Sequence, residues 1–246
     1  MMSKTGFTLS EVLITLAIIG IVAAMTLPII IKKYRHKVLE VQFKKTYTVL
    51  SQAAYAIPAE LSTCTYTEKA EITELLFARM NALESGTTES LNYDGFKTYT
   101  KEEGSSGIHP NCFDDKSNTH LKWAVTPDGT VIATCVNASY GTMISIDING
   151  SKKPPNAFGH DLFFFRIKPS DCQLVPMTGQ WRTCTEGETD CKNVGISSYD
   201  GYGWKWTTSY CTKDSASGEN GFSCTPYAIK NICPDDSSKG YFECLP

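Results

Sequence analysis

The amino-acid sequence predicts an α+β fold in which a long N-terminal helix packs on a small antiparallel sheet, followed by a cysteine-rich, irregular C-terminal region. Three observations lead to this prediction. The first is an almost wholly apolar run of 25 residues, Phe7 to Ile31, which continues as an amphipathic stripe. The second is a change to strand-like patterns after residue 120. The third is that all ten cysteines lie after residue 60.

The composition sets broad limits on function. A chain of 246 residues can form one medium domain plus an anchor, or two small domains. With 41% hydrophobic and 20% charged residues, most of the chain should fold. A formal net charge of -3 gives no general affinity for nucleic acid, so no such partner is expected.

The apolar run from Phe7 to Ile31 is long enough to cross a hydrocarbon core of about 30 Å as a helix. A cleaved secretory signal would have a shorter apolar region that ends in a small-residue site. No A-x-A pattern ends this run, which continues directly into Lys32. We therefore expect a transmembrane helix over residues 7–31.

Glu11 is the informative residue of this helix. A carboxylate costs on the order of 2.5–3.5 kcal/mol at the centre of a spanning helix and less near its end. Such a residue points to a functional partner, while the alternative is a side chain that snorkels to the interface. Glu11 alone leaves both interpretations open.

The surroundings of Glu11 add a motif. A short leader with Lys4 precedes the run Gly6-Phe7-Thr8-Leu9-Ser10-Glu11, and an apolar helix follows it. This pattern resembles the processing site of type IV prepilins and of type II secretion pseudopilins. The resemblance is strong over about the first thirty residues, because the junction, the charge and the span agree in spacing.

The resemblance implies specific roles. A prepilin peptidase would cut between Gly6 and Phe7 and methylate the new amino group of Phe7. Gly20 and Pro28 fall where many pilins carry residues that weaken the helix and let it loosen in the filament. The alternative for both is the ordinary tolerance of Gly and Pro in spanning helices. The protein would be a single-pass protein of the bacterial inner membrane, with a cytoplasmic leader and a periplasmic or extracellular head.

A basic run follows the span: Lys32, Lys33, Arg35, His36 and Lys37. The positive-inside rule would favour the reverse orientation. We keep the leader cytoplasmic because pilin-like helices often carry charges here. The run is expected to form a solvated collar or to contact lipid headgroups.

The helix is expected to continue over residues 32–58 and to end at Pro58. Glu40 and Lys44 form a favourable i,i+4 pair, which we place on a face separate from the apolar stripe. The stripe recurs at steps of three and four and comprises Leu39, Phe43, Tyr47, Leu50, Ala54 and Ile57.

The head, residues 59–168, begins with a predicted helix over Thr67 to Leu83. Residues 85–120 have the composition of a loop. Pro127-Asp128-Gly129 between two apolar runs indicates a hairpin with strands at 121–126 and 130–136. Further strands are predicted at 142–148 and 162–167, and the short links favour an antiparallel sheet.

The cysteines predict structural disulfides in an oxidising compartment. They form no C-x2-C pair of the kind that binds zinc. Cys184 and Cys191 are a plausible local pair, and the remaining connectivity stays open. The ten residues are Cys64, Cys112, Cys135, Cys172, Cys184, Cys191, Cys211, Cys224, Cys233 and Cys244.

Residues 169–246 hold seven of these cysteines, so disulfides are expected to replace much of a core there. A short helix is predicted around Pro226 to Cys233. The aromatic residues between Tyr199 and Tyr210 either pack this region or form a stacking surface for sugars or single strands.

A loop between two predicted strands gathers Asp147, Asn149 and Asp161. The segment resembles a part of pilin-like heads that holds calcium in the major secretion pseudopilins, and oxygen ligands are those calcium prefers. The alternative is that these residues only hydrogen-bond their own turns. No other cofactor is expected.

No catalytic motif is present, so no enzyme is predicted. We expect residues 1–6 to be a leader and the mature chain to be a structural subunit of a type IV pilus or secretion pseudopilus. Its partners would be other pilin-like subunits, the prepilin peptidase, the inner-membrane assembly platform and membrane lipid. The alternative is a minor or tip pilin that binds a ligand. Glu11 and the cleavage junction argue against a third class, an anchored enzyme or receptor that does not polymerise.

Overall fold

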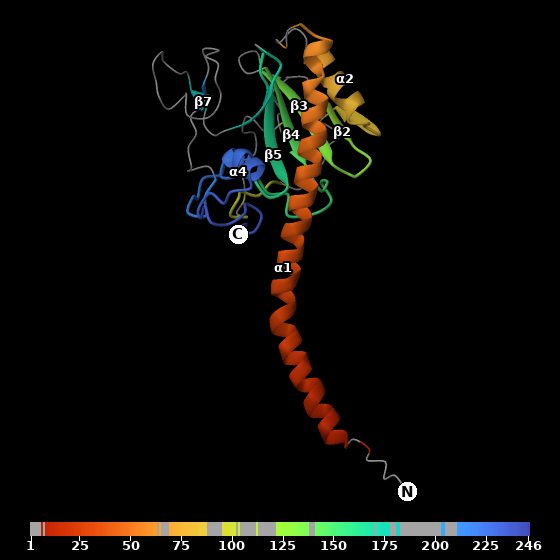
Figure 1. Cartoon of the computed structure of the whole chain (residues 1–246), viewed down its shortest axis with the longest axis vertical. Coiled ribbons are helices and arrows are strands. Elements are labelled where there is room, and N and C mark those ends of the chain that lie inside the picture. Colours follow the sequence, from red (N-terminus) through yellow and green to blue (C-terminus); the bar gives the residue numbers. More distant parts are fainter. Residues whose placement is uncertain are drawn as a thin grey trace.

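A computed structural model shows a long helix, α1, whose N-terminal half projects from a head that contains all the other elements (Figure 1). The head is a layer of helices on an antiparallel sheet, which confirms the predicted α+β class. The structure describes residues 6, 8–62, 64, 69–87, 95–101, 103, 112, 122–137, 141–169, 171–177, 181–182, 203–204 and 211–246.

Helix α1 spans Leu9–Tyr55, and a 3-10 turn, η1, covers Ile57–Ala59. Thr8 caps the start of the helix, and Pro58 lies in the 3-10 turn that follows its end. The end falls near the predicted position, because Pro58 has no N–H for a further α-helical hydrogen bond.

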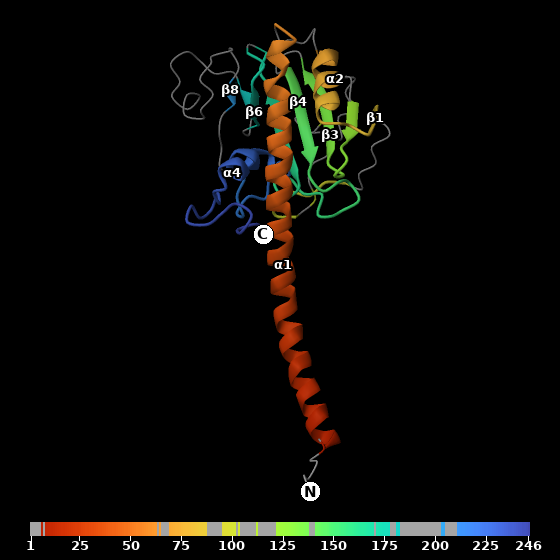
Figure 2. The same ribbon diagram turned by 45° about the vertical axis from the view of Figure 1, so that its right-hand side comes forward.

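The C-terminal half of α1 lies along the head in both views (Figures 1 and 2). Five residues of the predicted stripe are buried, and Tyr47 is half-buried. Glu40, expected on a separate face, is itself buried, so the charged pair with Lys44 lies beside the apolar contact rather than opposite it. The buried stripe residues are Leu39, Phe43, Leu50, Ala54 and Ile57.

Helix α2 is described over Lys69–Arg79 and ends four residues before the predicted end at Leu83, while residues 67 and 68 of the predicted span lie outside the described residues. It ends early because Asn81 adopts a left-handed conformation with φ of 53°, which turns the chain toward the sheet. Leu83, expected on the apolar face of the helix, is exposed. The buried side of α2 carries Ile72, Leu76 and Phe77.

The main sheet has six strands in sequence order, each antiparallel to the next. The predicted hairpin and the two later strands are confirmed within one or two residues. The first and last strands were not predicted. The strands are β1 Glu84–Thr87, β2 Lys122–Val125, β3 Val131–Asn137, β4 Gly141–Asp147, β5 Leu162–Ile167 and β6 Leu174–Pro176.

Alternation along the strands divides the core between the two faces of the sheet. Ile144, Phe163 and Phe165 belong to the cluster that includes the buried residues of α1 and α2. Met143 and Phe164 belong to a second cluster, with Phe158 and Phe222. Both faces of β5 are therefore covered, and all six residues of the strand, Arg166 included, are buried.

The C-terminal region adds a two-stranded sheet, β7 Trp181–Arg182 with β8 Gly203–Trp204, a 3-10 turn, η4 Phe222–Cys224, and helix α4 Thr225–Lys230. Helix α4 confirms the short helix predicted there. Residues 211–246 do not rely on disulfides alone, since Tyr241 and Phe242 join the main core. The ring centroids of Phe43 and Phe242 lie 5.6 Å apart, so this segment packs directly on α1.

Candidate functional site

The projecting half of α1 is the most distinctive surface of the molecule. Its large apolar side chains are exposed from Leu9 to Ile31. In the described part of the chain, one helical stretch, Leu9–Ala59, is long and apolar enough to cross a membrane, and its apolar window is 0% buried. A surface this apolar requires lipid or other apolar helices around it.

Glu11 lies in the first turn of α1 and forms a capping box with Thr8. The Thr8 N–H donates to Glu11 Oε2 at 2.8 Å, and the Glu11 N–H donates to Thr8 Oγ1 at 3.3 Å. The Thr8 hydroxyl also donates to Glu11 Oε2 at 2.8 Å. The carboxylate therefore closes the helix start, a role that the sequence analysis did not assign to it.

The other predicted N-terminal residues lie on or next to this projection. Gly6 is exposed, whereas Phe7 lies outside the described residues. Helix α1 continues through Gly20 and Pro28. A Cβ at Gly20 would meet nothing within 4 Å, so packing inside this chain does not require glycine there.

All eight described cysteines are paired, which confirms structural disulfides. Cys184 and Cys191, the predicted local pair, lie outside the described residues. The pairs, which join residues 11 to 108 positions apart, are Cys64–Cys172, Cys112–Cys135, Cys211–Cys224 and Cys233–Cys244.

The loop with the predicted metal ligands joins β4 to β5. Asp147 Oδ1 accepts hydrogen bonds from the N–H groups of Asn149, at 3.2 Å, and Gly150, at 2.9 Å. The Asp161 carboxylate accepts from the N–H groups of Asn156, at 2.9 Å, and Ala157, at 2.7 Å. Both aspartates thus hold turns of their own loop, as the alternative interpretation described.

The same loop places two carboxyl groups close together in the interior of the head. Asp147 and Asp161 are fully buried. Burial, with the nearby Asp147 as a second cause, raises the pKa of Asp161 to about 7. The buried Asn149 Oδ1 accepts no hydrogen bond from any described residue. No group of three or more His, Cys, Asp or Glu side chains among the described residues is placed to hold a metal.

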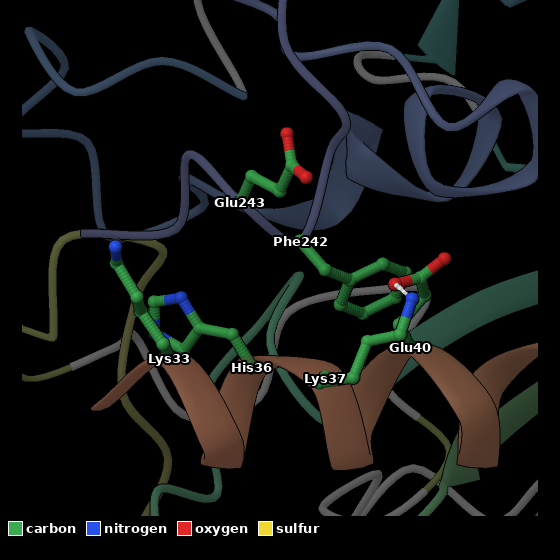
Figure 3. Close-up of a pocket in the computed structure, with 6 residues that line it drawn as sticks. All are labelled: Lys33, His36, Lys37, Glu40, Phe242 and Glu243. Atoms are coloured by element: carbon green, nitrogen blue, oxygen red, sulfur yellow. Dashed lines mark hydrogen bonds and ion pairs between the residues drawn. The ribbon is translucent and has the colours of Figure 1, made fainter. Parts of the chain in front are cut away.

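A cavity at the base of the head was not predicted. It lies between α1 and the C-terminal segment and has a volume of about 330 Å³ (Figure 3). Sequence reasoning found the basic run but not the segment that covers it, because the two are about 200 residues apart. The lining residues are Lys33, His36, Lys37, Glu40, Phe242 and Glu243.

Comparison with known proteins identifies the N-terminal segment. Residues 1–27 match the family model described as Prokaryotic N-terminal methylation motif. The matched segment contains Gly6, Phe7, Glu11 and Gly20 and ends one residue before Pro28. No curated protein and no solved structure matches the chain.

Proposed function

We propose that this chain, a type IV pilin-like or pseudopilin precursor by its N-terminal methylation motif, is a structural subunit of a type IV pilus or of a type II secretion pseudopilus. One observation carries the proposal. From Leu9 onward, the matched motif lies on the half of α1 that projects from the head with its apolar side chains exposed. The family that this motif marks is structural rather than enzymatic.

The projecting half of α1 serves two environments in this proposal. The apolar helix and the motif fit single-pass anchoring in the inner membrane, where lipid surrounds the helix before assembly. In a filament, the helices of other pilin-like subunits replace the lipid. The helix then forms the filament core and the head its surface, with the leader on the cytoplasmic side beforehand.

Glu11 supplies the register between subunits in this mechanism. Cleavage after Gly6 creates a positive amino group on Phe7, close to the start of α1. Pairing of that group with Glu11 of a neighbouring subunit neutralises two charges at a depth where unpaired charge is costly. Prepilin peptidase and the inner-membrane assembly platform are the further partners that these steps require.

Intact-mass analysis of the protein from its native membrane tests the proposal. We expect a chain that lacks residues 1–6, begins at Phe7 and carries one added methyl group. A chain that retains Met1, or one that is cut after Ile31, contradicts the proposal. The copy number in sheared filaments then separates a shaft subunit from a minor or tip pilin, because a shaft needs thousands of copies.

We also propose that calcium binds between Asp147, Asn149 and Asp161. The two buried carboxylates repel each other, and the Asn149 Oδ1 accepts no hydrogen bond from any described residue, so a cation fits this set of oxygen atoms. The turn hydrogen bonds would hold the loop in position, and the ion would neutralise the charge of its two carboxylates.

Thermal unfolding with calcium and with chelator tests the metal. At 100 times its dissociation constant, a ligand of the folded state adds about 2.7 kcal/mol of stability. The gain should be absent from an Asp147→Ala/Asp161→Ala double variant. An unchanged melting temperature, or an equal gain in that variant, leaves the turn hydrogen bonds as the whole explanation.

A further inference from the structure

The cavity at the base of the head lies where α1 leaves it. Lys33 and His36 rise from α1 toward the C-terminal segment, and the Phe242 ring points back toward the helix (Figure 3). The C-terminal segment therefore converts one side of a basic helix into the wall of a half-open cavity. Phe242 is buried and holds this arrangement through its contact with Phe43.

The cavity lies at a defined height above the apolar segment. Ile31 is the last residue of the exposed apolar run, and Lys33 and His36 follow it within five positions. At 1.5 Å per residue, five positions correspond to about 7.5 Å. Each headgroup layer of a bilayer is about 5–7 Å thick. With the apolar run in the membrane, the cavity therefore opens into the headgroup layer.

The acidic side chains of the cavity already have partners. Glu40 pairs with Lys37 at 2.8 Å and with Lys44 at 2.5 Å. Glu243 Oε2 accepts a hydrogen bond from the Gly240 N–H at 3.2 Å. Of the two lysines in the cavity wall, Lys37 is therefore paired with Glu40, and Lys33 forms no ion pair with another described residue.

Besides Lys37, three lysines lie in or near this cavity. Lys32, Lys33 and Lys101 form no ion pair with another described residue. Lys101 donates a hydrogen bond to the Pro246 carbonyl. Burial, then Lys32 and Lys101, lower the pKa of His36, and burial, then Lys32 and Lys97, lower that of Lys101. Positive charge on His36 and Lys101 is thus disfavoured, first by burial and then by the neighbouring lysines, and a bound anion would offset both effects.

We propose that this cavity binds the phosphate group of an anionic phospholipid, with Lys33 and His36 in its wall and Lys32 and Lys101 beside it. Ammonium groups bind phosphate oxygens through charge-assisted hydrogen bonds. The bound lipid fixes the depth and rotation of the head relative to the bilayer while the protein is anchored in the membrane. The inference requires membrane anchoring but not polymerisation.

Native mass spectrometry of the full-length chain in detergent, titrated with phosphatidylglycerol and separately with phosphatidylcholine, tests the site. We expect the unmodified chain to retain more phosphatidylglycerol than phosphatidylcholine. A Lys33→Gln/Lys101→Gln variant should bind it about 30-fold more weakly, from about fivefold per lysine near an anionic headgroup. A Lys33→Arg/Lys101→Arg variant should keep the preference.

The matched control is Lys45→Gln/Lys122→Gln, which removes the same charge from two lysines paired elsewhere, with Asp128 and Glu74. It should bind as the unmodified chain does, and equal melting temperatures show that each variant is folded. Equal retention of the two lipids, or equal loss in control and test variants, overturns the proposal. If glycerol phosphate displaces the lipid at equal concentration, the site takes a soluble phosphate and the lipid assignment is wrong.

Discussion

At the residue scale, the Glu11 carboxylate caps the start of α1 together with Thr8 and is also the proposed contact between subunits. In the single chain, the Glu11 carboxylate is occupied by the Thr8 N–H and hydroxyl. In the proposed filament, it also faces the amino group of a neighbouring Phe7. One carboxylate therefore has two roles, capping of the helix and pairing with the neighbouring subunit. Substitutions at Glu11 and at Thr8 separate these roles.

We predict that Glu11→Ala yields a cleaved, membrane-held protein that does not enter filaments, because the carboxylate partner of the neighbouring amino group is gone. Thr8→Ala is the matched variant. It removes the hydroxyl cap, at a cost of about 1 kcal/mol to the helix start, but keeps the charge. It should still enter filaments. The measurement is the ratio of sheared to membrane-bound protein, and normal assembly of Glu11→Ala would remove this residue from the mechanism.

Asp161 predicts an unusual pH dependence. Its pKa in the folded chain is about 7, against an ordinary value of 3.8. Between these values the folded state holds a proton that the unfolded state releases, so stability from this group is full below about pH 4. It is lost as the pH rises through 7. We expect the head to lose stability from pH 5 to pH 8 in chelator.

Denaturant unfolding at the two pH values provides the measurement for Asp161. Asp161→Asn should flatten the pH dependence of stability. Asp171→Asn, at a less buried carboxylate that follows the C-terminal end of β5, should leave that dependence unchanged. The same slope in Asp161→Asn and in the unmodified chain would show that other groups cause it. Saturating calcium, if it binds, should restore stability at pH 8, because it replaces the proton.

At the scale of elements, the Cys64–Cys172 disulfide ties the end of the first helix to the chain after β5. It closes a separation of 108 residues, whereas Cys233–Cys244 closes one of 11. The chain-entropy relation assigns about 4.7 kcal/mol to a 100-residue loop and about 3 kcal/mol to a 15-residue one.

We therefore predict that Cys64→Ser/Cys172→Ser lowers the free energy of unfolding by about 2 kcal/mol more than Cys233→Ser/Cys244→Ser does. Guanidinium titrations of both double variants under non-reducing conditions give the comparison. The opposite order would mean that packing of the C-terminal segment, rather than loop length, governs the difference.

Phe242 connects the C-terminal segment to α1, and its side chain is almost fully buried. Phe242→Ala should lower the free energy of unfolding by about 3–5 kcal/mol, through lost burial and the cavity that remains. The control is Tyr55→Ala. Tyr55 lies on α1 and its side chain is 88% exposed, so its truncation should cost less than about 0.5 kcal/mol. Thermal unfolding followed by near-ultraviolet dichroism checks both, and a small effect at Phe242 would show that the segment is only loosely attached.

The elements that local pattern determines were predicted closely, and those that distant partners determine were not. The periodicity of α1, the Pro-Asp-Gly hairpin and the apolar β5 each carry their own signal. Strand β1, Glu-Ser-Gly-Thr, has little strand propensity and exists because β2 pairs with it. The cavity at the base of the head likewise needs Phe242 and Lys33 in one wall, and no local pattern in the sequence encodes that arrangement.

At the scale of the whole molecule, the projecting half of α1 and the head are structurally separable. The apolar window of α1 is 0% buried, so the head gains no packing from it. We predict that a chain beginning at Lys32 folds to a monomeric head whose melting temperature lies within a few degrees of the full chain's. Calorimetry in detergent and in buffer makes the comparison, and a truncated head that unfolds would show that the projecting half stabilises it.

The Cys64–Cys172 bond also sets the path along which the molecule carries mechanical load. A pull on α1 that is resisted by a contact on the C-terminal segment passes from Cys64 through the sulfur atoms to Cys172. The five strands β1 to β5 lie within the bypassed stretch and experience no tension along the backbone. That stretch of 108 residues would otherwise release about 370 Å of contour length, at about 3.4 Å per residue. A fibre built from such subunits is therefore inextensible at strands β1 to β5, and its compliance resides in the helix and in the chain after Cys172, which includes β6.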